Sequence, residues 1–272
     1  MTRLALVLFT LTATLFIASL LVGPAGMGAT ESLSALLWGD GGPLTLVMRE
    51  IRLPRAVLAL MIGAALGLAG AAMQGYLRNP LADPGLILAG IAISALAAAL
   101  TSLVLNLSPN PFAANEIVFW MMGSLADRSM VHVWIALPLI VLGAVALATL
   151  ARGLDALTLG EDAAQALGIN LTGLRLTLVF GTAAVVGAST AVAGAIGFVG
   201  LVVPHLLRPF VGAQPGRLLW ASAFGGACML LAADIAVRVI LPARDLKLGV
   251  VTALIGAPLF LHLIYRTRRE GI

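Results

Sequence analysis

The stretch LTLVFGTAAVVGASTAVAGAIGFVGLVVPHLL, residues 176–207, contains no aspartate, glutamate, lysine or arginine over 32 positions. One helix needs only about 20 apolar residues to cross the hydrocarbon of a bilayer, so this run is too long for a single crossing. Its second half holds residues that break or bend membrane helices, namely Gly194, Gly197, Gly200 and Pro204. The stretch therefore predicts two crossings that divide near Ala193, with the second ending near Val211.

The composition of the whole chain also indicates a lipid environment. Hydrophobic residues make up 61% of the 272 residues and charged residues 10%, against about 45–50% and about 25% in ordinary globular domains. Long neutral runs are stable where lipid surrounds them, and there only helices satisfy their own backbone hydrogen bonds. We expect an all-α fold, a polytopic membrane helical bundle, with residues 1–272 forming a single transmembrane domain.

Charge-poor windows along the chain predict about eight transmembrane helices. They cover residues 4–22, 56–77, 85–107, 129–151, 176–193, 194–211, 218–240 and 248–265. The first window exceeds the apolar core of a secretory signal, about 7–15 residues, so we predict a retained span. Arginines flank both ends of the chain, at position 3 and at positions 266, 268 and 269. The positive-inside tendency then places both termini in the cytoplasm. Two termini on the same side require an even number of crossings, and eight crossings meet this requirement.

The sequence lacks the features of several functional classes. Cys228 is the only cysteine, so there is no disulfide framework and no cysteine-based metal site. No GxxxxGK[ST] phosphate loop occurs, and the three histidines, at positions 132, 205 and 262, are scattered. No dense basic run suggests nucleic-acid binding. We therefore predict a protein that is not an enzyme, with no catalytic residues, no metal site and no cofactor.

Residues 154–175, LDALTLGEDAAQALGINLTGLR, are polar although they lie between two apolar runs. Gly160 precedes an acidic first turn, which suits a helix N-terminus, and Gly168 is placed to end the helix. Ala164, Leu167 and Gly168 are expected to share one shallow face of this helix. On an eight-span layout the helix is cytoplasmic. This helix either packs into a groove of another protein or is an interfacial loop helix without a partner.

The LxLGExxAxxLGI pattern of this segment resembles the coupling helix of FecCD-type permeases, the type II ABC importers that move iron-siderophores, haem and cobalamin. Other stretches match that family in the same order. They are RLPR at 52–55, LALMIGAALGLAGAAMQ at 58–74, RNPLADPG at 78–85, LAGIAIS at 88–94, FWMMGSL at 119–125, GAIGFVGLVVPHLLR at 194–208, LLAADIAVR at 230–238 and GVVTALIGAP at 249–258. The resemblance covers nearly the whole chain.

The resemblance implies roles for residues in these motifs. The residues that it assigns to ATPase coupling are Gly160, Glu161, Ala164, Leu167 and Gly168. Those assigned to docking of a substrate-binding protein are Arg52, Arg55 and Arg238, and those of an external gate segment are Phe119, Trp120 and Gly123. The implied partners are an ABC ATPase subunit dimer, a substrate-binding protein, and a second permease copy or homologous permease. Membrane lipid surrounds the chain, and no nucleic acid is expected.

Several of these assignments have a simpler alternative. The arginines at 52, 55 and 238 could instead snorkel to lipid phosphates. Phe119 and Trp120 could be interfacial aromatic anchors. Asp234, an acid at membrane depth, could be a proton or ion site. However, Arg238 lies four residues later on the same helix face, which favours a structural ion pair that positions the arginine.

The chain departs from the family in its number of spans. Members of the family have ten, and here DPGLI runs directly into LAGIAIS near residues 85–88. We predict that two consecutive spans are missing and that the third and fifth are fused into one helix, residues 85–107. Both parent helices run in the same direction, so the fusion preserves the orientation of everything that follows. A second departure is Lys247, which stands where the family commonly has proline.

The sequence as a whole predicts the permease subunit of an ABC importer in a bacterial plasma (inner) membrane. The expected substrate is a metal chelate, a ferric siderophore first, with haem and cobalamin open. The energy would come from ATP hydrolysis in a separate subunit. Two alternatives remain, namely an ion-coupled secondary transporter that uses Asp234 and an inactive truncated permease.

Overall fold

The computed structural model describes residues 2–23, 27–39, 41–77, 84–212, 214–240 and 246–270, and within them it contains helices and no strand. The first half of the chain forms α1 (Thr2–Leu21), α2 (Ala29–Trp38), α3 (Pro43–Leu46), the π-helix η1 (Val47–Arg52), α4 (Leu53–Leu77), α5 (Pro84–Leu107) and α6 (Pro111–Met121). The second half forms α7 (Met130–Thr149), α8 (Ala151–Leu157), α9 (Glu161–Ala166), α10 (Leu171–Ala193), α11 (Val199–Leu207), the 3₁₀ helix η2 (Arg208–Val211), α12 (Pro215–Ile240) and α13 (Leu248–Glu270). The predicted all-α fold class is confirmed.

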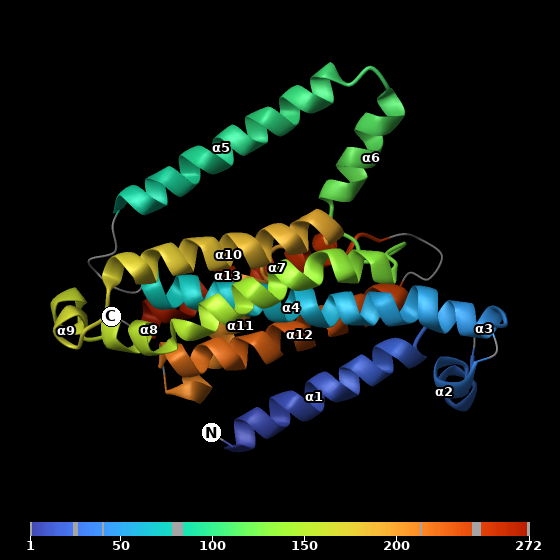
Figure 1. Cartoon of the computed structure of the whole chain (residues 1–272), viewed down its shortest axis with the longest axis horizontal. Helices are drawn as coiled ribbons and strands as arrows, with labels where there is room; N and C mark the ends of the chain where they lie inside the picture. The colour runs from blue at the N-terminus through green and yellow to red at the C-terminus, as the bar shows by residue number, and fades with distance from the viewer. Residues whose placement is uncertain are drawn as a thin grey trace.

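The long helices run back and forth through one bundle, with α4 at its centre (Figure 1). α1 begins and α13 ends at the end of the bundle where α9 lies, called the α9 end below. α2 and α3 lie at the opposite end, called the α3 end. The two ends of the chain and the polar segment 154–175 therefore share one end of the bundle, as an even number of crossings requires.

Within the described residues, six helices are long and apolar enough to cross a membrane, and two further apolar helices are shorter. The six are Arg3–Leu21, Pro43–Leu77, Leu88–Leu107, Met130–Thr149, Leu171–Ala193 and Pro215–Ile240, and the two shorter ones are Val199–Val211 and Leu248–Leu261. A helix therefore occupies each of the eight predicted windows. The motif at 78–85 lies outside the described residues except for its last two positions.

Close contact between the backbones of α4 and α12 forms the centre of the core. A Cβ atom added to Gly67 would lie 2.9 Å from the carbonyl carbon of Ser222, and one added to Gly226 would lie 3.0 Å from that of Gly63. Small residues at such positions let helix backbones approach in lipid, where van der Waals packing replaces the hydrophobic effect between helices. The GxxxG pattern of α4 is thus a packing surface, and its partner is α12.

The long apolar run divides at the predicted place, because α10 ends at Ala193. Residues 194–198 are not helical, and Phe198 has φ of +67°, in the left-handed region that side chains other than glycine rarely adopt. α11 begins only at Val199, so the following crossing consists of a non-helical entry and a short helix. Such backbone is tolerated at membrane depth only where protein or a cavity covers it.

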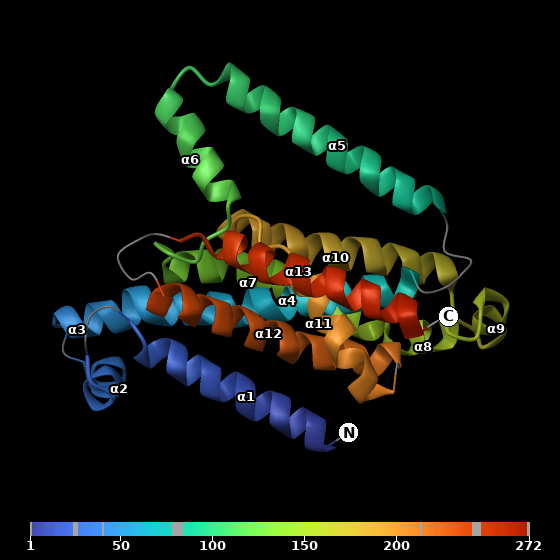
Figure 2. The ribbon, with the colours of Figure 1, turned by 180° about the vertical axis from the view of Figure 1, so that it is seen from behind.

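α5 lies apart from the bundle in both views of the ribbon (Figures 1 and 2). The rest of the chain buries none of the span Leu88–Leu107. Its exposed side chains include Ile91, Leu96 and Leu103. An apolar helix without a buried face in its own chain must be covered by lipid or by another protein.

The connection between the first two spans is helical over much of its length. Within residues 27–39 and 41–52 it forms α2, α3 and η1. The backbone N–H of Gly28 donates to the Glu31 carboxylate at 3.1 Å, a contact typical of the start of a helix. The π-helix immediately precedes α4 and carries Arg49 and Arg52.

We predict that Gly67→Ala lowers the free energy of unfolding by about 1–3 kcal/mol, the usual cost of overpacking a core. The added methyl group would press on the backbone of α12, which cannot turn aside as a flexible side chain would. The matched control is Gly187→Ala in α10, where an added Cβ meets nothing within 4 Å. Thermal unfolding of the purified variants in detergent measures both. Equal melting temperatures would contradict the close packing of α4 on α12.

Candidate functional site

A buried acidic group lies between two arginines near the α3 end of the bundle. Asp234 on α12 has no exposed surface. Its Oδ1 lies 2.8 Å from Arg55 Nε on α4, and its Oδ2 lies 2.9 Å from Arg238 Nη2 one turn later on α12. The predicted ion pair of Asp234 with Arg238 is confirmed. Arg55 as the second partner was missed, because 179 residues separate it from the aspartate.

The same arginines hold the end of α1. Arg238 Nη1 donates to the carbonyls of Ser19 and Val22, each at 2.8 Å, and Arg52 Nη1 donates to those of Leu20 and Leu21, each at 3.0 Å. The last four carbonyls of a helix have no partner within it, and positive charge is favourable there because of the helix dipole. Two guanidinium groups therefore cap α1 and fasten it to η1, which leads into α4, and to α12.

This role limits how the arginines can meet another molecule. Arg52 is 4% exposed, and the side chains of Arg238 and Arg55 are 7% and 18% exposed. Snorkelling of Arg52 and Arg238 to lipid phosphates is contradicted, because both guanidinium groups are buried on carbonyl oxygens. Docking of a partner by the three arginines stays a prediction, and in this structure Arg55 is the most accessible of them.

At the α9 end, the two predicted glycines flank α9: Gly160 directly precedes it, and Gly168 follows two residues after its last residue. Gly160 has φ of +100° and Gly168 φ of +83°, backbone that favours glycine. The N–H of Ile169 returns to the carbonyl of Ala164 at 3.0 Å, which closes the last turn. Glu161 in the first turn forms an ion pair with Arg175 Nη2 at 3.0 Å, which ties α9 to α10.

The expectation that Ala164 shares an exposed face with Leu167 and Gly168 is wrong. Ala164 is 0% exposed and packs against its own chain, whereas Leu167 is 65% exposed. The helix ends at Ala166, and Leu167 has φ of −79° and ψ of +4°, so the spacing of an ideal helix no longer applies to it. The exposed residues from Asp162 to Gly168 are Asp162, Gln165, Ala166, Leu167 and Gly168, so Leu167 and Gly168 are accessible together and Ala164 is not.

The predicted gate residues lie where α6 meets α13 and the non-helical segment 194–198. Gly123 has φ of +73°, and its carbonyl accepts a hydrogen bond from the Gly249 N–H at 3.1 Å. Phe119 and Trp120 on α6 are 56% and 38% exposed. The Lys247 ammonium lies 5.7 Å from the centre of the Phe119 ring, a distance typical of a cation–π contact.

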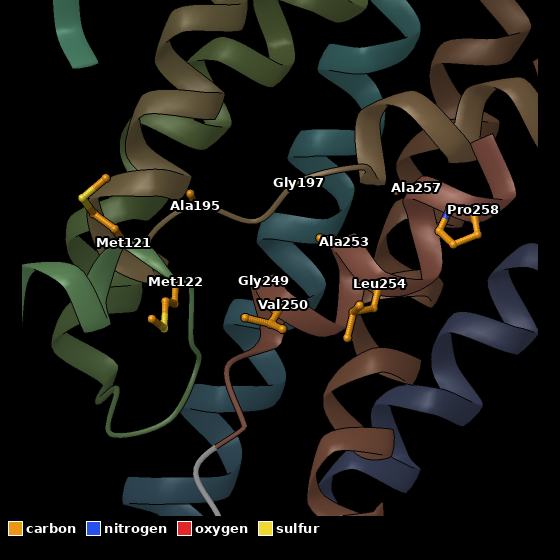
Figure 3. Close-up of a pocket in the computed structure, with 10 residues that line it drawn as sticks. All are labelled: Met121, Met122, Ala195, Gly197, Gly249, Val250, Ala253, Leu254, Ala257 and Pro258. Atoms are coloured by element: carbon orange, nitrogen blue, oxygen red, sulfur yellow. The ribbon is translucent and has the colours of Figure 1, made fainter. Parts of the chain in front are cut away.

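A pocket of about 600 Å³ opens at this junction. Figure 3 shows its walls, which come from the end of α6, from Ala195 and Gly197 of the non-helical segment, and from α13. The residues drawn there are Met121, Met122, Ala195, Gly197, Gly249, Val250, Ala253, Leu254, Ala257 and Pro258, and none is charged. A site of this size and character suits a bulky ligand held by apolar contacts rather than a small ion.

Metal-binding side chains do not gather in the part of the chain that the structure describes. No group of three or more histidines, cysteines or acidic residues there could hold a metal ion. Asp234, the one fully buried acid among the described residues, is engaged by the two arginines.

The chain is similar to membrane permeases over most of its length. The family model of the FecCD transport family matches residues 11–87 and 85–266. The hemin transport system permease protein HmuU of Yersinia pestis is 33% identical over 312 aligned positions, which cover 92% of this chain and 93% of the relative. The Fe(3+) dicitrate transport system permease protein FecD of Escherichia coli is 34% identical (85% and 89% covered). The vitamin B12 import system permease protein BtuC of Klebsiella pneumoniae is 36% identical (82% and 83% covered).

A solved structure agrees with this similarity. A metal-chelate type ABC transporter in an inward-facing conformation superposes with a TM-score of 0.85 and 29% identity, covering 98% of this chain and 100% of the other. The alignment with HmuU is longer than the part of this chain that it covers. Because 92% of 272 residues is about 250, roughly 60 of the 312 aligned positions have no counterpart in this chain.

We predict that Asp234→Asn lowers the free energy of unfolding by about 3–5 kcal/mol, the usual cost of removing one partner of a buried ion pair. Arg55 and Arg238 would then remain buried without a counter-charge. The control is Glu161→Gln, because the Glu161–Arg175 pair is partly exposed, at 19% and 38%, and should contribute at most about 1 kcal/mol. Thermal unfolding in detergent compares the two variants, and similar losses would show that Asp234 is not the counter-charge of this cluster.

Proposed function

Because this chain belongs to the FecCD transport family, we propose that it is the membrane permease subunit of an ABC importer that moves a metal chelate into the cytoplasm. The observation that carries the proposal is the similarity to named permeases, which extends over more than four fifths of this chain and of each relative. The relatives' names concern hemin, ferric dicitrate and vitamin B12. A ferric siderophore is the first candidate substrate here, with haem and cobalamin as alternatives.

The apolar pocket is the proposed part of this chain that meets the substrate. A chelate of a metal in a large organic ligand is bulky, and it presents carbon-rich surface to a site without charged residues. The pocket borders the non-helical segment 194–198 and α13. These two elements therefore form one wall of the proposed pathway.

A second copy, or a homologous permease, is the proposed partner within the membrane. α5 has no buried face in its own chain. Phe119 and Trp120 on α6, next to the pocket, are also accessible. A pathway between two permease chains would cover these surfaces and close the open side of the pocket.

α9 is the proposed contact with a dimer of ATPase subunits. It is rigidly held, by two glycine-dependent ends and by the ion pair of Glu161 with Arg175. Its accessible side carries Leu167, which is 65% exposed, between the small residues Ala166 and Gly168. On this proposal the α9 end and both termini are cytoplasmic, in a bacterial plasma membrane.

The α3 end is the proposed contact with a substrate-binding protein. Arg49 and Glu50 are both exposed in η1, and their charges balance each other. Arg52, Arg55 and Arg238 add three positive charges, which Asp234 only partly balances. An excess of positive charge attracts an acidic partner at long range and orients it. Arg52 and Arg238, which are buried, would attract the binding protein through their electrostatic field, and Arg55 would contact it directly.

The two-span deletion is a further part of the proposal. The family match divides into two stretches that overlap at residues 85–87, and the total of roughly 60 positions without a counterpart in the alignment with HmuU suits two spans of about 20 residues with their connections. α5 is the proposed fused helix. The alternative is an inactive truncated permease, and the exposed surface of α5 favours that alternative.

The decisive test is uptake into vesicles that contain this chain, an ABC ATPase of the same cell and the binding protein. We expect uptake of a radiolabelled ferric chelate that requires ATP and survives collapse of the proton gradient. Uptake that proceeds without the ATPase and stops on Asp234→Asn would establish a secondary transporter instead. An assembled complex that hydrolyses ATP but moves none of the three substrate types would identify an inactive permease.

We predict that Leu167→Glu reduces co-purification of the ATPase at least about tenfold, since ~1.4 kcal/mol of lost affinity corresponds to that factor and a buried unpaired charge costs more. The side chain is exposed in the isolated chain, so membrane expression should be unchanged. Leu167→Met keeps an apolar contact of similar volume and is the matched control. Full retention of the ATPase by Leu167→Glu would exclude this face of α9 from the interface.

A further inference from the structure

Pro204 leaves one carbonyl of α11 without a partner in its own helix. In an α-helix the carbonyl of residue 200 accepts a hydrogen bond from the N–H of residue 204. Proline has no N–H, so the Gly200 carbonyl loses that partner. α11 comprises only Val199–Leu207, and an unpaired carbonyl at membrane depth is costly.

Gln74 of α4 supplies the missing donor. Its Nε2 donates to the Gly200 carbonyl at 3.0 Å and to the Leu201 carbonyl at 3.0 Å. Its Oε1 accepts from Arg208 Nη2 at 3.1 Å, and Arg208 directly follows α11. Both hydrogens and the oxygen of the amide are thus used, and they hold the first turn of α11 and the residue that directly follows its last turn. We call these three hydrogen bonds the Gln74 bridge.

Two glycines let the amide reach the backbone of α11. A Cβ atom added to Gly200 would lie 2.9 Å from the Leu66 carbonyl oxygen and 3.3 Å from the Gly70 Cα. α11 therefore lies directly on the backbone of α4 over the turn that precedes Gln74. A side chain at either glycine would push α11 away from the amide.

The position of α11 also fixes a wall of the pocket. Only residues 194–198 connect α10 to α11, and Ala195 and Gly197 of this connection line the pocket. Phe198 packs against α13, because a Cβ atom added to Gly256 would lie 2.6 Å from the Phe198 ring. Five non-helical residues between two anchored helices leave little freedom, so a shift of α11 must move the wall.

From this geometry we propose that Gln74 is a positioning residue for transport. Through the Gln74 bridge it sets the place of α11 on α4 and, through the connection 194–198, the shape of the pocket. The structural part of the inference is independent of the activity, whereas its transport part rests on the proposed function. The residues involved are separated by 126 to 134 positions in the chain.

The test uses a double-mutant cycle in which a second change restores the missing hydrogen bond. Gln74→Met removes both donors at similar volume and leaves the Gly200 carbonyl unpaired. Pro204→Ala returns an N–H to position 204, so the helix can pair that carbonyl by itself. If the Gln74 bridge acts through the carbonyl, the effect of Gln74→Met must be smaller in the Pro204→Ala background than alone.

The first measurement is the rate of thiol labelling of Ala195→Cys by a maleimide, in a Cys228→Ser background and in detergent. Ala195 is accessible in the pocket wall. We expect Gln74→Met to change the rate about fivefold, the factor that corresponds to a net hydrogen bond of ~1 kcal/mol. With Pro204→Ala present, the change should fall within about twofold. Gln214→Met, which alters an exposed glutamine next to α12, is the control and should leave the rate unchanged.

An unchanged labelling rate in Gln74→Met would overturn the inference. A change that Pro204→Ala does not reduce would also overturn it, since the Gly200 carbonyl would then not be the group involved. If Gln74→Met does not reach the membrane, Arg208→Met supplies the measurement, because it removes the hydrogen bond that orients the amide. The expected change in the labelling rate is then less than about fivefold, and Pro204→Ala should again reduce it.

The second measurement is ATP-dependent uptake, normalised to the chain present in the vesicles. We expect Gln74→Met to lower the maximal rate about fivefold and Pro204→Ala to restore part of it, with Gln214→Met unaffected. Normal uptake in Gln74→Met despite altered labelling would exclude a role in transport. If the labelling cycle behaves as expected but the parent chain moves no substrate, the proposed function fails while the Gln74 bridge stands.

Discussion

A backbone carbonyl inside a bilayer has no water from which to accept a hydrogen bond, so every helix end and every break at membrane depth must find a donor in the protein. In this chain side chains from distant segments supply these donors. The last carbonyls of α1 accept from Arg52 and Arg238, and the carbonyl that Pro204 leaves unpaired accepts from Gln74. The arginines fasten α1 to η1 and α12, and Gln74 fastens α11 to α4. The ends and breaks of helices thus decide, together with the small residues of α4, which helices are joined in the bundle.

The same constraint explains the charges near the α3 end. A buried guanidinium group is costly unless hydrogen bonds and an opposite charge compensate it. Arg238 has both, because it contacts Asp234 and the carbonyls of Ser19 and Val22. An aspartate shared between two arginines is poorly placed to carry protons, which argues against the secondary-transporter alternative. The arginines that the family resemblance assigns to docking have a structural role in this chain, and the proposed binding protein would meet them mainly through Arg55 and through their combined electrostatic field.

α5 represents the opposite situation, an apolar helix whose own backbone hydrogen bonds hold it together while none of its described span Leu88–Leu107 is buried by the chain. Backbone pairing within the helix keeps it intact, so nothing in its own hydrogen bonding requires the bundle. Its exposed apolar side chains must therefore be covered by lipid or by another protein. A fused helix that lost its two neighbouring spans would have this character, and a second permease chain would supply the missing contacts.

The sequence by itself determined the all-α membrane fold, the eight apolar windows, the break after Ala193 and the glycine-bounded helix at 160–168, because hydropathy, glycine and proline act over a few neighbouring residues. It also pointed to the pairing of Asp234 with Arg238, which lie one helical turn apart. Only the tertiary structure decided that Arg55 is the second partner of Asp234, that Gln74 pairs the carbonyl freed by Pro204, and that Ala164 faces inward. These contacts join segments far apart in the chain, or depend on where a six-residue helix stops. Local patterns carry no information on either, since the packing of helices against one another sets which side chains meet.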